Sequence, residues 1–343
     1  MNISGLTLSN GNGTGGGSTF GGAILAENNS NLKLDKIILS SNFAEAYGAA
    51  FLSGGAGRVI NSTISTNSAN TGLAIGVSGT LNIANTTVSG NLDADGGTGI
   101  GAIYVTGTAN IRNSTIAFNR TSGGTGGGIF NAGTLNIGNT IVSNNIAATS
   151  PDIHRSSGTI TSVGGNLVQN PNGFPAGTFS QLNDVTGVDP NLAALANNGG
   201  NVPTHALDTQ SPAVNTGINA NAIDPFDNSV LVYDARGVGF NRIVGGLVDK
   251  GAFETVGPTA SNARIAGRVT GNGVGVKGAR VTVADANNNA RNALTNNFGY
   301  YVVEDLEAGQ TYVISVSSKR FRFSSQIRSV TESISDLDFV GEE

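Results

Sequence analysis

Short apolar runs recur in a fixed order through the first half of the chain, separated by Gly, Asn and Ser. One run reads Asn-Ser-Thr-Ile at 61–64 and at 113–116, and Asn-Thr-Thr-Val at 85–88. In each copy another Asn stands three residues after the end of the run. A second run, Gly-Thr-Leu-Asn-Ile from Gly79, alternates apolar and polar residues, and a third, Gly-Ile-Phe at 128–130, is also repeated. The closing asparagines are spaced by 25, 24, 28 and 26 residues: Asn42, Asn67, Asn91, Asn119 and Asn145.

This repeat predicts a β-solenoid. Alternation of apolar and polar residues is typical of a half-buried strand, and no run is long enough for a helix. Three short strands per coil, each paired with its copy in the next coil, would form parallel sheets around a narrow core. We expect the five closing asparagines to stack into a ladder of hydrogen-bonded amides.

The composition fits such a coil and excludes several classes of protein. Gly accounts for 51 of 343 residues, and the bends of a slim solenoid leave little room for Cβ atoms. The absence of Cys excludes disulfides and thiolate metal sites, and the net charge of -5 argues against nucleic acid or an anionic membrane as a partner. The sequence shows neither a transmembrane run nor a leader, so we expect Met1 to lie within a longer gene that carries a signal peptide upstream.

A change of pattern divides the chain into domains. Residues 1–180 hold 12 charged residues, whereas 262–343 hold 18. We predict β-helix repeats of about 24–28 residues over 1–180 and a C-terminal cap over 181–256, because a solenoid needs its last coil covered. A linker over 257–262 leads to longer alternating strands over 263–343, which predict a small β-sandwich.

Two parts of the sequence resemble known families. The repeat, with Pro203-Thr204-His205-Ala206-Leu207 and Val248-Asp249-Lys250-Gly251-Ala252-Phe253-Glu254, resembles right-handed parallel β-helix surface proteins of the choice-of-anchor and polymorphic outer-membrane type in bacteria. Val276-Lys277-Gly278-Ala279-Arg280-Val281 and Asn297-Phe298-Gly299-Tyr300-Tyr301 are similar to the carboxypeptidase-regulatory-like (transthyretin-like) domain. The resemblances imply an all-β chain in which a right-handed β-helix precedes a transthyretin- or Ig-like sandwich without peptidase activity.

Few residues of the repeat could support catalysis or bind a metal. Asp93 and Asp95 form the best acidic cluster of 1–180, and Arg112 and Arg120 follow on the next coil. Asp-x-Asp-Gly resembles the start of a calcium loop, but Tyr104 stands where that loop needs Glu. We interpret the pair as a solvated turn, with calcium binding as the alternative, and expect no catalytic residue and no other cofactor.

The histidines and the Asn-x-Ser/Thr triplets also have structural explanations. His154 and His205 each lie in a motif of the tail, so we expect structural or surface roles for both. Asn61, Asn85 and Asn113 begin possible glycosylation triplets, although the repeat alone explains them.

These observations favour a non-catalytic structural or adhesive protein, secreted or on the cell surface, with carbohydrate or another surface protein as its partner. The alternative is a polysaccharide lyase or glycoside hydrolase of the β-helix type, because such enzymes need an acid and a base or calcium ligands in a groove. Convergence of Asp93, Asp95, Arg112 and Arg120 would favour the enzyme, and dispersal around the solenoid would favour the structural protein.

Overall fold

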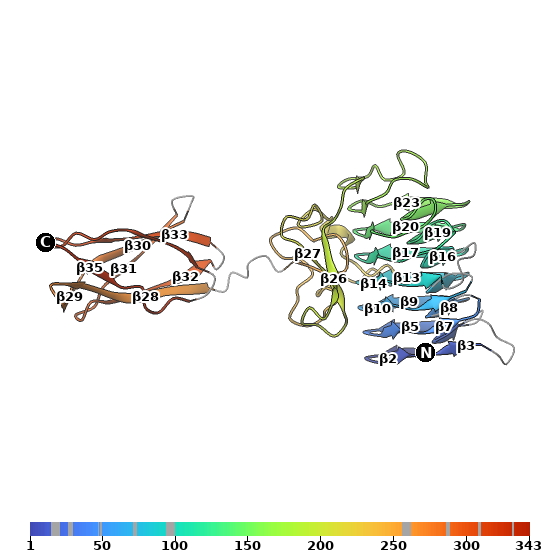
Figure 1. Ribbon diagram of the computed structural model, residues 1–343, viewed down its shortest axis with the longest axis horizontal. Coiled ribbons are helices and arrows are strands. Elements are labelled where there is room, and N and C mark those ends of the chain that lie inside the picture. The colour runs from blue at the N-terminus through green and yellow to red at the C-terminus, as the bar shows by residue number, and fades with distance from the viewer. Residues whose placement is uncertain are drawn as a thin grey trace. The chain divides into compact units, whose positions relative to one another are not determined.

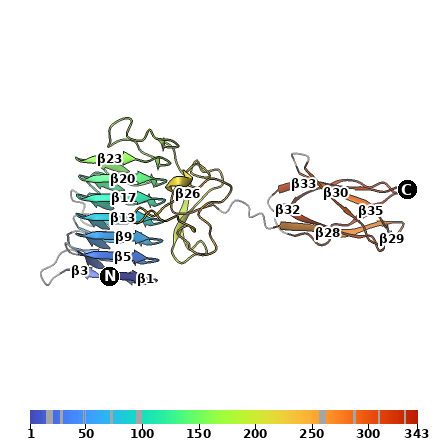
Figure 2. The ribbon, with the colours of Figure 1, turned by 180° about the vertical axis from the view of Figure 1, so that it is seen from behind.

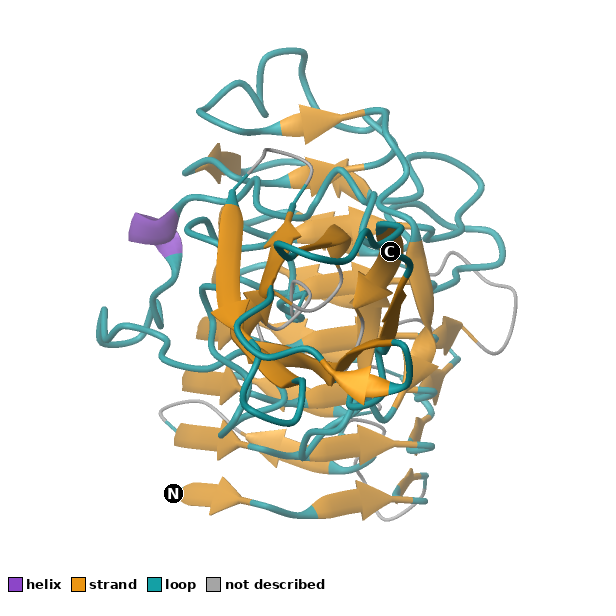
Figure 3. Cartoon of the chain, turned by 90° about the vertical axis from the view of Figure 1, so that its left-hand side faces the viewer, coloured by secondary structure: helices purple, strands orange, loops and turns teal. Residues whose placement is uncertain are grey.

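The computed structural model divides the chain into two compact units, Met1–Thr255 and Val256–Glu343. It describes every residue except 15–20, 27–29, 47, 49, 71–73, 94–99, 256–261, 286–288, 308–309 and 331–332. The described residues contain no α-helix, and their one helical turn is η1 (Asn219–Asn221), drawn in purple in Figure 3. The all-β class predicted from the sequence is confirmed.

The first unit is a parallel β-solenoid of about five turns between residues 31 and 168, with one earlier turn before them (Figures 1 and 2). Two sheets run its whole length. Sheet A contains β1 (Asn2–Ser4), β5 (Asn31–Asp35), β9 (Ala56–Ile60), β13 (Thr80–Ala84), β17 (Thr108–Arg112), β20 (Thr134–Gly138) and β23 (Thr159–Ser162). Sheet B contains β2 (Thr7–Ser9), β6 (Ile38–Ser40), β10 (Thr63–Ser65), β14 (Thr87–Ser89), β18 (Thr115–Ala117), β21 (Ile141–Ser143), β24 (Leu167–Val168) and β25 (Val185–Thr186).

Two shorter sheets complete each coil. Sheet C contains β3 (Asn12–Gly13), β7 (Phe43–Ala44), β11 (Ser68–Ala69) and β15 (Leu92–Asp93). Sheet D contains β4 (Ile24–Ala26), β8 (Phe51–Ser53), β12 (Ile75–Val77), β16 (Ile103–Val105), β19 (Ile129–Asn131) and β22 (Ile153–Arg155). The three predicted runs form sheets A, B and D, whereas sheet C was not predicted because strands of two residues leave no alternation to detect.

The inner coils bury equivalent positions, whereas Ile3, Leu8 and Ile160 of the end coils are only partly buried. In one coil, Leu81, Ile83, Val88 and Ile103 point into a continuous apolar core that follows the solenoid axis. Glycine occupies the corner between sheets D and A, since a Cβ atom on Gly107 would collide with the backbone oxygens of Ser78 and Gly79 in the coil below. The glycine content therefore has the steric cause that the sequence suggested.

The tail of the first unit lies beside the solenoid rather than over its last coil, so the predicted cap over 181–256 is largely misplaced. The end of the stack is covered by residues 169–187, where Phe174 and Phe179 pack on the core and β25 pairs with β24. The hairpin of β26 (Leu192–Ala196) and β27 (Thr204–Leu207) stands alongside several coils (Figures 1 and 2). Short Thr and Ser side chains on sheet B allow this approach, as the Thr63 hydroxyl donates to the Pro203 carbonyl.

The second unit is a β-sandwich. One sheet contains β29 (Val274–Gly275), β28 (Asn262–Gly271), β32 (Tyr300–Glu307) and β35 (Phe339–Gly341). The other contains β31 (Ala290–Leu294), β30 (Arg280–Ala284), β33 (Gln310–Ser317) and β34 (Gln326–Val330). Their inner faces enclose a core of Ile265, Val281, Val283, Tyr301 and Ile314. The predicted linker over 257–262 falls almost wholly outside the described residues, and β28 begins at its last position.

Candidate functional site

The closing asparagines of the repeat form one continuous file of buried amides. Each Nδ2 donates to the Oδ1 of the next Asn at 2.9 Å, from Asn42 through to Asn145. Each Nδ2 also donates to a carbonyl oxygen of sheet B in the previous coil, as Asn119 does to Val88 at 3.0 Å. The residue before each Asn has a left-handed φ, which turns the chain toward sheet C: Ser41, Thr66, Gly90, Phe118 and Asn144. These amides therefore have a structural role.

A buried carboxylate ends this file. The Oδ1 atom of Asp152 accepts the Asn145 Nδ2 at 3.0 Å, and its Oδ2 atom accepts the Asn170 backbone N–H at 2.7 Å. Asp152 is 1% exposed, and burial raises its pKa to about 6 although these hydrogen bonds oppose the shift. An Asn here would direct an NH₂ group at another donor, so a side chain with two acceptors suits the end of the ladder.

A second file of asparagines fastens the tail to the solenoid. Asn61, Asn85, Asn113 and Asn139 all have φ between 46° and 50° at the corner between sheets A and B. The Asn85, Asn113 and Asn139 amides donate to backbone carbonyls of the tail at 2.7–2.9 Å. Asn85 and Asn113 are fully buried, so two of the three possible glycosylation triplets are inaccessible in the folded chain.

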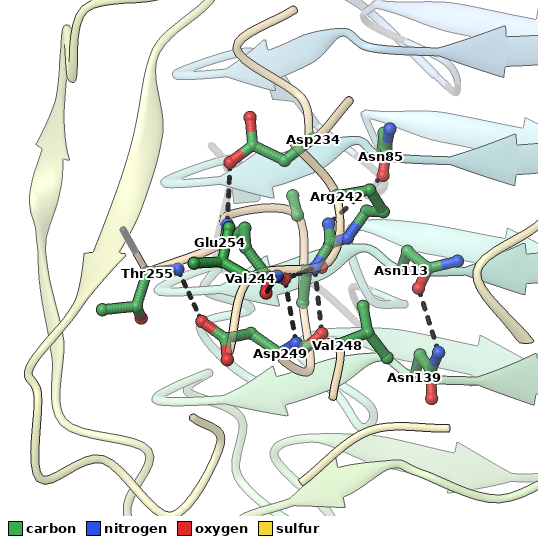
Figure 4. Close-up of polar contacts among 12 residues, drawn as sticks. Asn85, Asn113, Asn139, Asp234, Arg242, Val244, Val248, Asp249, Glu254 and Thr255 are labelled. Carbon is green, nitrogen blue, oxygen red and sulfur yellow. Dashed lines mark hydrogen bonds and ion pairs between the residues drawn. The ribbon is translucent and has the colours of Figure 1, made fainter. Parts of the chain in front are cut away.

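A network of buried charges holds the tail together next to this file (Figure 4). Arg242 is fully buried and donates to Glu254 at 3.1 Å, to Asn85 and to two backbone carbonyls. Glu254 also accepts the backbone N–H groups of Val244 and Asp249 at 2.9 Å. Burial raises the pKa of Glu254 to about 7, against the opposing effect of Arg242.

Two further cations of the tail are buried with their partners. Arg236 pairs with Asp234 at 2.7 Å, and its guanidinium lies over the rings of both Phe240 and Phe253. Lys250 donates to the Asn183 carbonyl at 2.7 Å, and burial lowers its pKa to about 8. Sequence reasoning assigned no role to Arg242, Lys250, Glu254 or Asp152, and the tail motif at 248–254 contains only Lys250 and Glu254 of these four.

His205 contributes to the contact between the tail and sheet B. Its Nδ1 lies 2.7 Å from the Ala193 carbonyl and its Nε2 lies 2.8 Å from the Ser89 hydroxyl. The ring also contacts Phe118, with 5.0 Å between centroids. Burial lowers the His205 pKa, and the neutral ring satisfies both neighbours, so the geometry gives His205 a packing role.

The three candidate catalytic residues that the structure describes, Asp93, Arg112 and Arg120, lie on different faces of the solenoid. Asp93 points inward from sheet C and is 4% exposed, whereas Arg120 is exposed on the outer face beside it. Arg112 belongs to sheet A and donates to the carbonyls of Ile111 and Asn136; burial lowers its pKa to about 10. Asp95 lies outside the described residues. Among the described residues, no three acidic or histidine side chains gather as they would around a metal ion.

Sheet D presents an aromatic file on its outer face. Tyr104, Phe130 and His154 occupy the same position in three successive coils, with centroid distances of 5.5 and 5.0 Å. All three are half-buried, and partial burial lowers the His154 pKa. Sheet D lies on the side of the stack away from β26 and β27 (Figure 1). We call Tyr104, Phe130 and His154 the aromatic file.

A file of amides lies around the next corner, on the outer face of sheet A. The Asn110 Nδ2 donates to the Asn82 Oδ1 at 2.9 Å, and the Asn136 Nδ2 donates to the Asn110 Oδ1 at 2.8 Å. Asn110 and Asn136 are half-exposed. Only Thr106 and Gly107 separate β16 from β17, so an apolar surface and a polar surface meet along one edge of the solenoid.

Comparison with known protein families assigns a domain class to the second unit, whereas the first unit is described by its structure. Residues 264–340 match the carboxypeptidase regulatory-like domain, so this part of the chain is a domain of that class. None of the curated proteins matches the sequence. The described part of the chain has no helix long and apolar enough to span a membrane. The chain thus joins a parallel β-solenoid to a carboxypeptidase regulatory-like domain, as predicted.

Proposed function

We propose that this chain is a non-catalytic structural or adhesive protein, secreted or exposed on a cell surface, whose solenoid binds glycans along the aromatic file. The observation that carries the proposal is the position of Tyr104, Phe130 and His154 in register on a face away from the tail hairpin. Aromatic rings supply a large contact area at binding surfaces, and Tyr104 adds a polar end. The amides of sheet A offer hydrogen bonds nearby. The regulatory-like domain is typical of extracellular and surface proteins, which supports the location.

The non-catalytic part of the proposal rests on the separation of Asp93, Arg112 and Arg120. General acid and base groups must reach the same scissile bond. Arg112 belongs to sheet A, whereas Asp93 and Arg120 come from adjacent coils at sheet C and face opposite sides of the solenoid wall. Turnover of a polysaccharide that disappears in Asp93→Ala would overturn this part.

The test of glycan binding is a panel of soluble and immobilised polysaccharides screened with the full chain. We expect Phe130→Ala to weaken binding of a retained glycan about tenfold, which corresponds to ~1.4 kcal/mol of lost contact. Phe130 is on the outer face, so the variant should keep its fold and its circular dichroism spectrum. The matched control is Tyr300→Ala, which removes a 53% exposed ring of the second unit. Retained binding in Phe130→Ala, or loss only in Tyr300→Ala, would refute the assignment to the aromatic file.

A further inference from the structure

One corner of the solenoid holds a bulky aromatic side chain where the neighbouring coils hold small or polar ones. The corner between sheets B and C has a left-handed φ in five successive coils, at Ser41, Thr66, Gly90, Phe118 and Asn144. Phe118 has a φ of 57°, a region that is unfavourable for a bulky residue. Its side chain is nevertheless 41% exposed. A strained backbone that holds an aromatic ring at the surface is a reason to look for a function of that ring.

Phe118 borders a surface groove of about 440 Å³, a volume typical of small-molecule sites. Ile146 and Pro151 also line the groove, and Ile146 is 56% exposed. Asn144 takes the place of Phe118 at the same corner in the next coil, and Gln169 comes from the coil after that. The groove therefore crosses three coils and combines apolar walls with two amides.

These two amides have hydrogen-bonding atoms available to a ligand. Gln169 Oε1 accepts the Asn144 backbone N–H at 2.7 Å, whereas Gln169 Nε2 has no partner among the described residues. Asn144 Nδ2 makes only a long hydrogen bond of 3.4 Å to Ser143 Oγ. Both amide side chains are half-buried. An amide supplies donors and an acceptor, so the pair can bond hydroxyl groups in either sense.

The charge of the groove indicates a neutral ligand. Its described lining contains no Lys, Arg or His, so an anionic ligand would meet no cation there. Its one acidic residue is Asp152, which is 1% exposed and already accepts N–H groups of Asn145 and Asn170. A ligand with an apolar face and several hydroxyl groups fits this combination of side chains.

We propose that this groove binds a neutral sugar, whose ring packs on Phe118 and whose hydroxyl groups bond to Asn144 and Gln169. A pyranose ring has a face of C–H groups and a rim of hydroxyls, which match the aromatic ring and the two amides. The groove lies at the corner between sheets B and C, whereas the aromatic file lies on sheet D. It is therefore a second site, and it does not depend on glycan binding by the aromatic file.

The experiment is saturation-transfer NMR on the full chain, with glucose, galactose, N-acetylglucosamine, maltose and cellobiose as probes. We expect at least one of these sugars to bind, and Phe118→Ser to weaken that binding about tenfold through loss of the ring. Ser occupies this corner at position 41, so the variant should fold. Asn144→Gly removes an amide and places at this corner the residue found at position 90, and it should weaken binding several-fold.

The matched control is a pair of variants on sheet C. Leu92 is 45% exposed and occupies the position of Ile146 two coils earlier, outside the groove. Ile146→Ser should weaken sugar binding, whereas Leu92→Ser should leave it unchanged. Circular dichroism checks the fold of each variant, and Asn144→Gly decides the question if Phe118→Ser does not fold.

Three results would overturn the proposal: no sugar of the panel binds, binding survives in Phe118→Ser, or Leu92→Ser weakens it as much as Ile146→Ser. Binding that is lost in Phe130→Ala but kept in Phe118→Ser would assign the sugar to the aromatic file and also overturn the groove. Binding that is lost in Phe118→Ser but kept in Phe130→Ala would support the groove, whatever the outcome for the aromatic file.

Discussion

The asparagine ladder predicts that removal of one side chain, in Asn119→Ala, causes a large loss of stability. The Asn119 side chain is fully buried and makes four hydrogen bonds. It donates to Asn145 and to the Val88 carbonyl, and it accepts the Asn91 side-chain amide and the Asn91 backbone N–H. At about 1 kcal/mol for each bond, Asn119→Ala should lower the free energy of unfolding by about 4 kcal/mol. That is a large fraction of the 5–15 kcal/mol typical of a whole domain.

Urea unfolding followed by far-ultraviolet circular dichroism measures this loss, with the slope checked for a change in cooperativity. Asn119→Asp tests the hydrogen bonds more directly, because it keeps nearly the same shape but places an acceptor oxygen against the Val88 and Asn145 oxygens. We expect it to be at least as destabilising as Asn119→Ala at pH 8. Asn110→Ala, in the half-exposed amide file, is the matched control and should cost about 1 kcal/mol or less. A loss below 1 kcal/mol in Asn119→Ala, or a stable Asn119→Asp, would refute the reasoning.

Two more predictions concern buried carboxylates. The folded pKa of Asp152, about 6, lies above its ordinary value of 3.8, so the folded state binds more protons and stability falls as pH rises from about 4 to 6. The stability of the wild type relative to Asp152→Asn should fall by about 3 kcal/mol across that window, and a flat difference would contradict the shift. Glu254→Ala strands the buried Arg242 and should cost about 3–5 kcal/mol in urea unfolding, whereas Glu343→Ala, which breaks the exposed pair with Arg320, should leave the midpoint unchanged. Equal effects of these two variants would show that burial of the Arg242 pair is unimportant.

The repeat could be predicted from the sequence because each coil solves the same packing problem with the same residues. The alternation around Leu81 and Ile83 identified sheet A, and the regular return of Asn identified a position that every coil needs. Sheet C and the position of the tail could not be predicted in this way. Sheet C is too short to show a period, and the tail is placed by contacts such as Thr63 with Pro203, more than a hundred residues apart.

The roles of the site residues also depend on contacts between coils, which the sequence alone does not show. Asp93 was identified from its neighbour Asp95 in the sequence, but its inward direction follows from its register with Ala69, which requires the alignment of whole coils. The aromatic file was not identified because Tyr104, Phe130 and His154 are scattered in the sequence and become neighbours only through the stacking of coils. Arg242 and Glu254 are ordinary charges in sequence and become a buried pair only after the tail folds back.

The tail that fastens to the side of the solenoid sets an order of events during synthesis. Its contacts reach Thr63, Asn85, Thr115 and Asn139, which belong to four successive coils. A chain made from its N-terminus has all these coils outside the ribosome before residues 188–255 exist, so the coils first rely only on their immediate neighbours. When the tail docks, it couples distant coils, and opening one of them then requires the tail to release the others. A chain ending at residue 187 should therefore exchange its amide hydrogens coil by coil, whereas the longer chain exchanges them together.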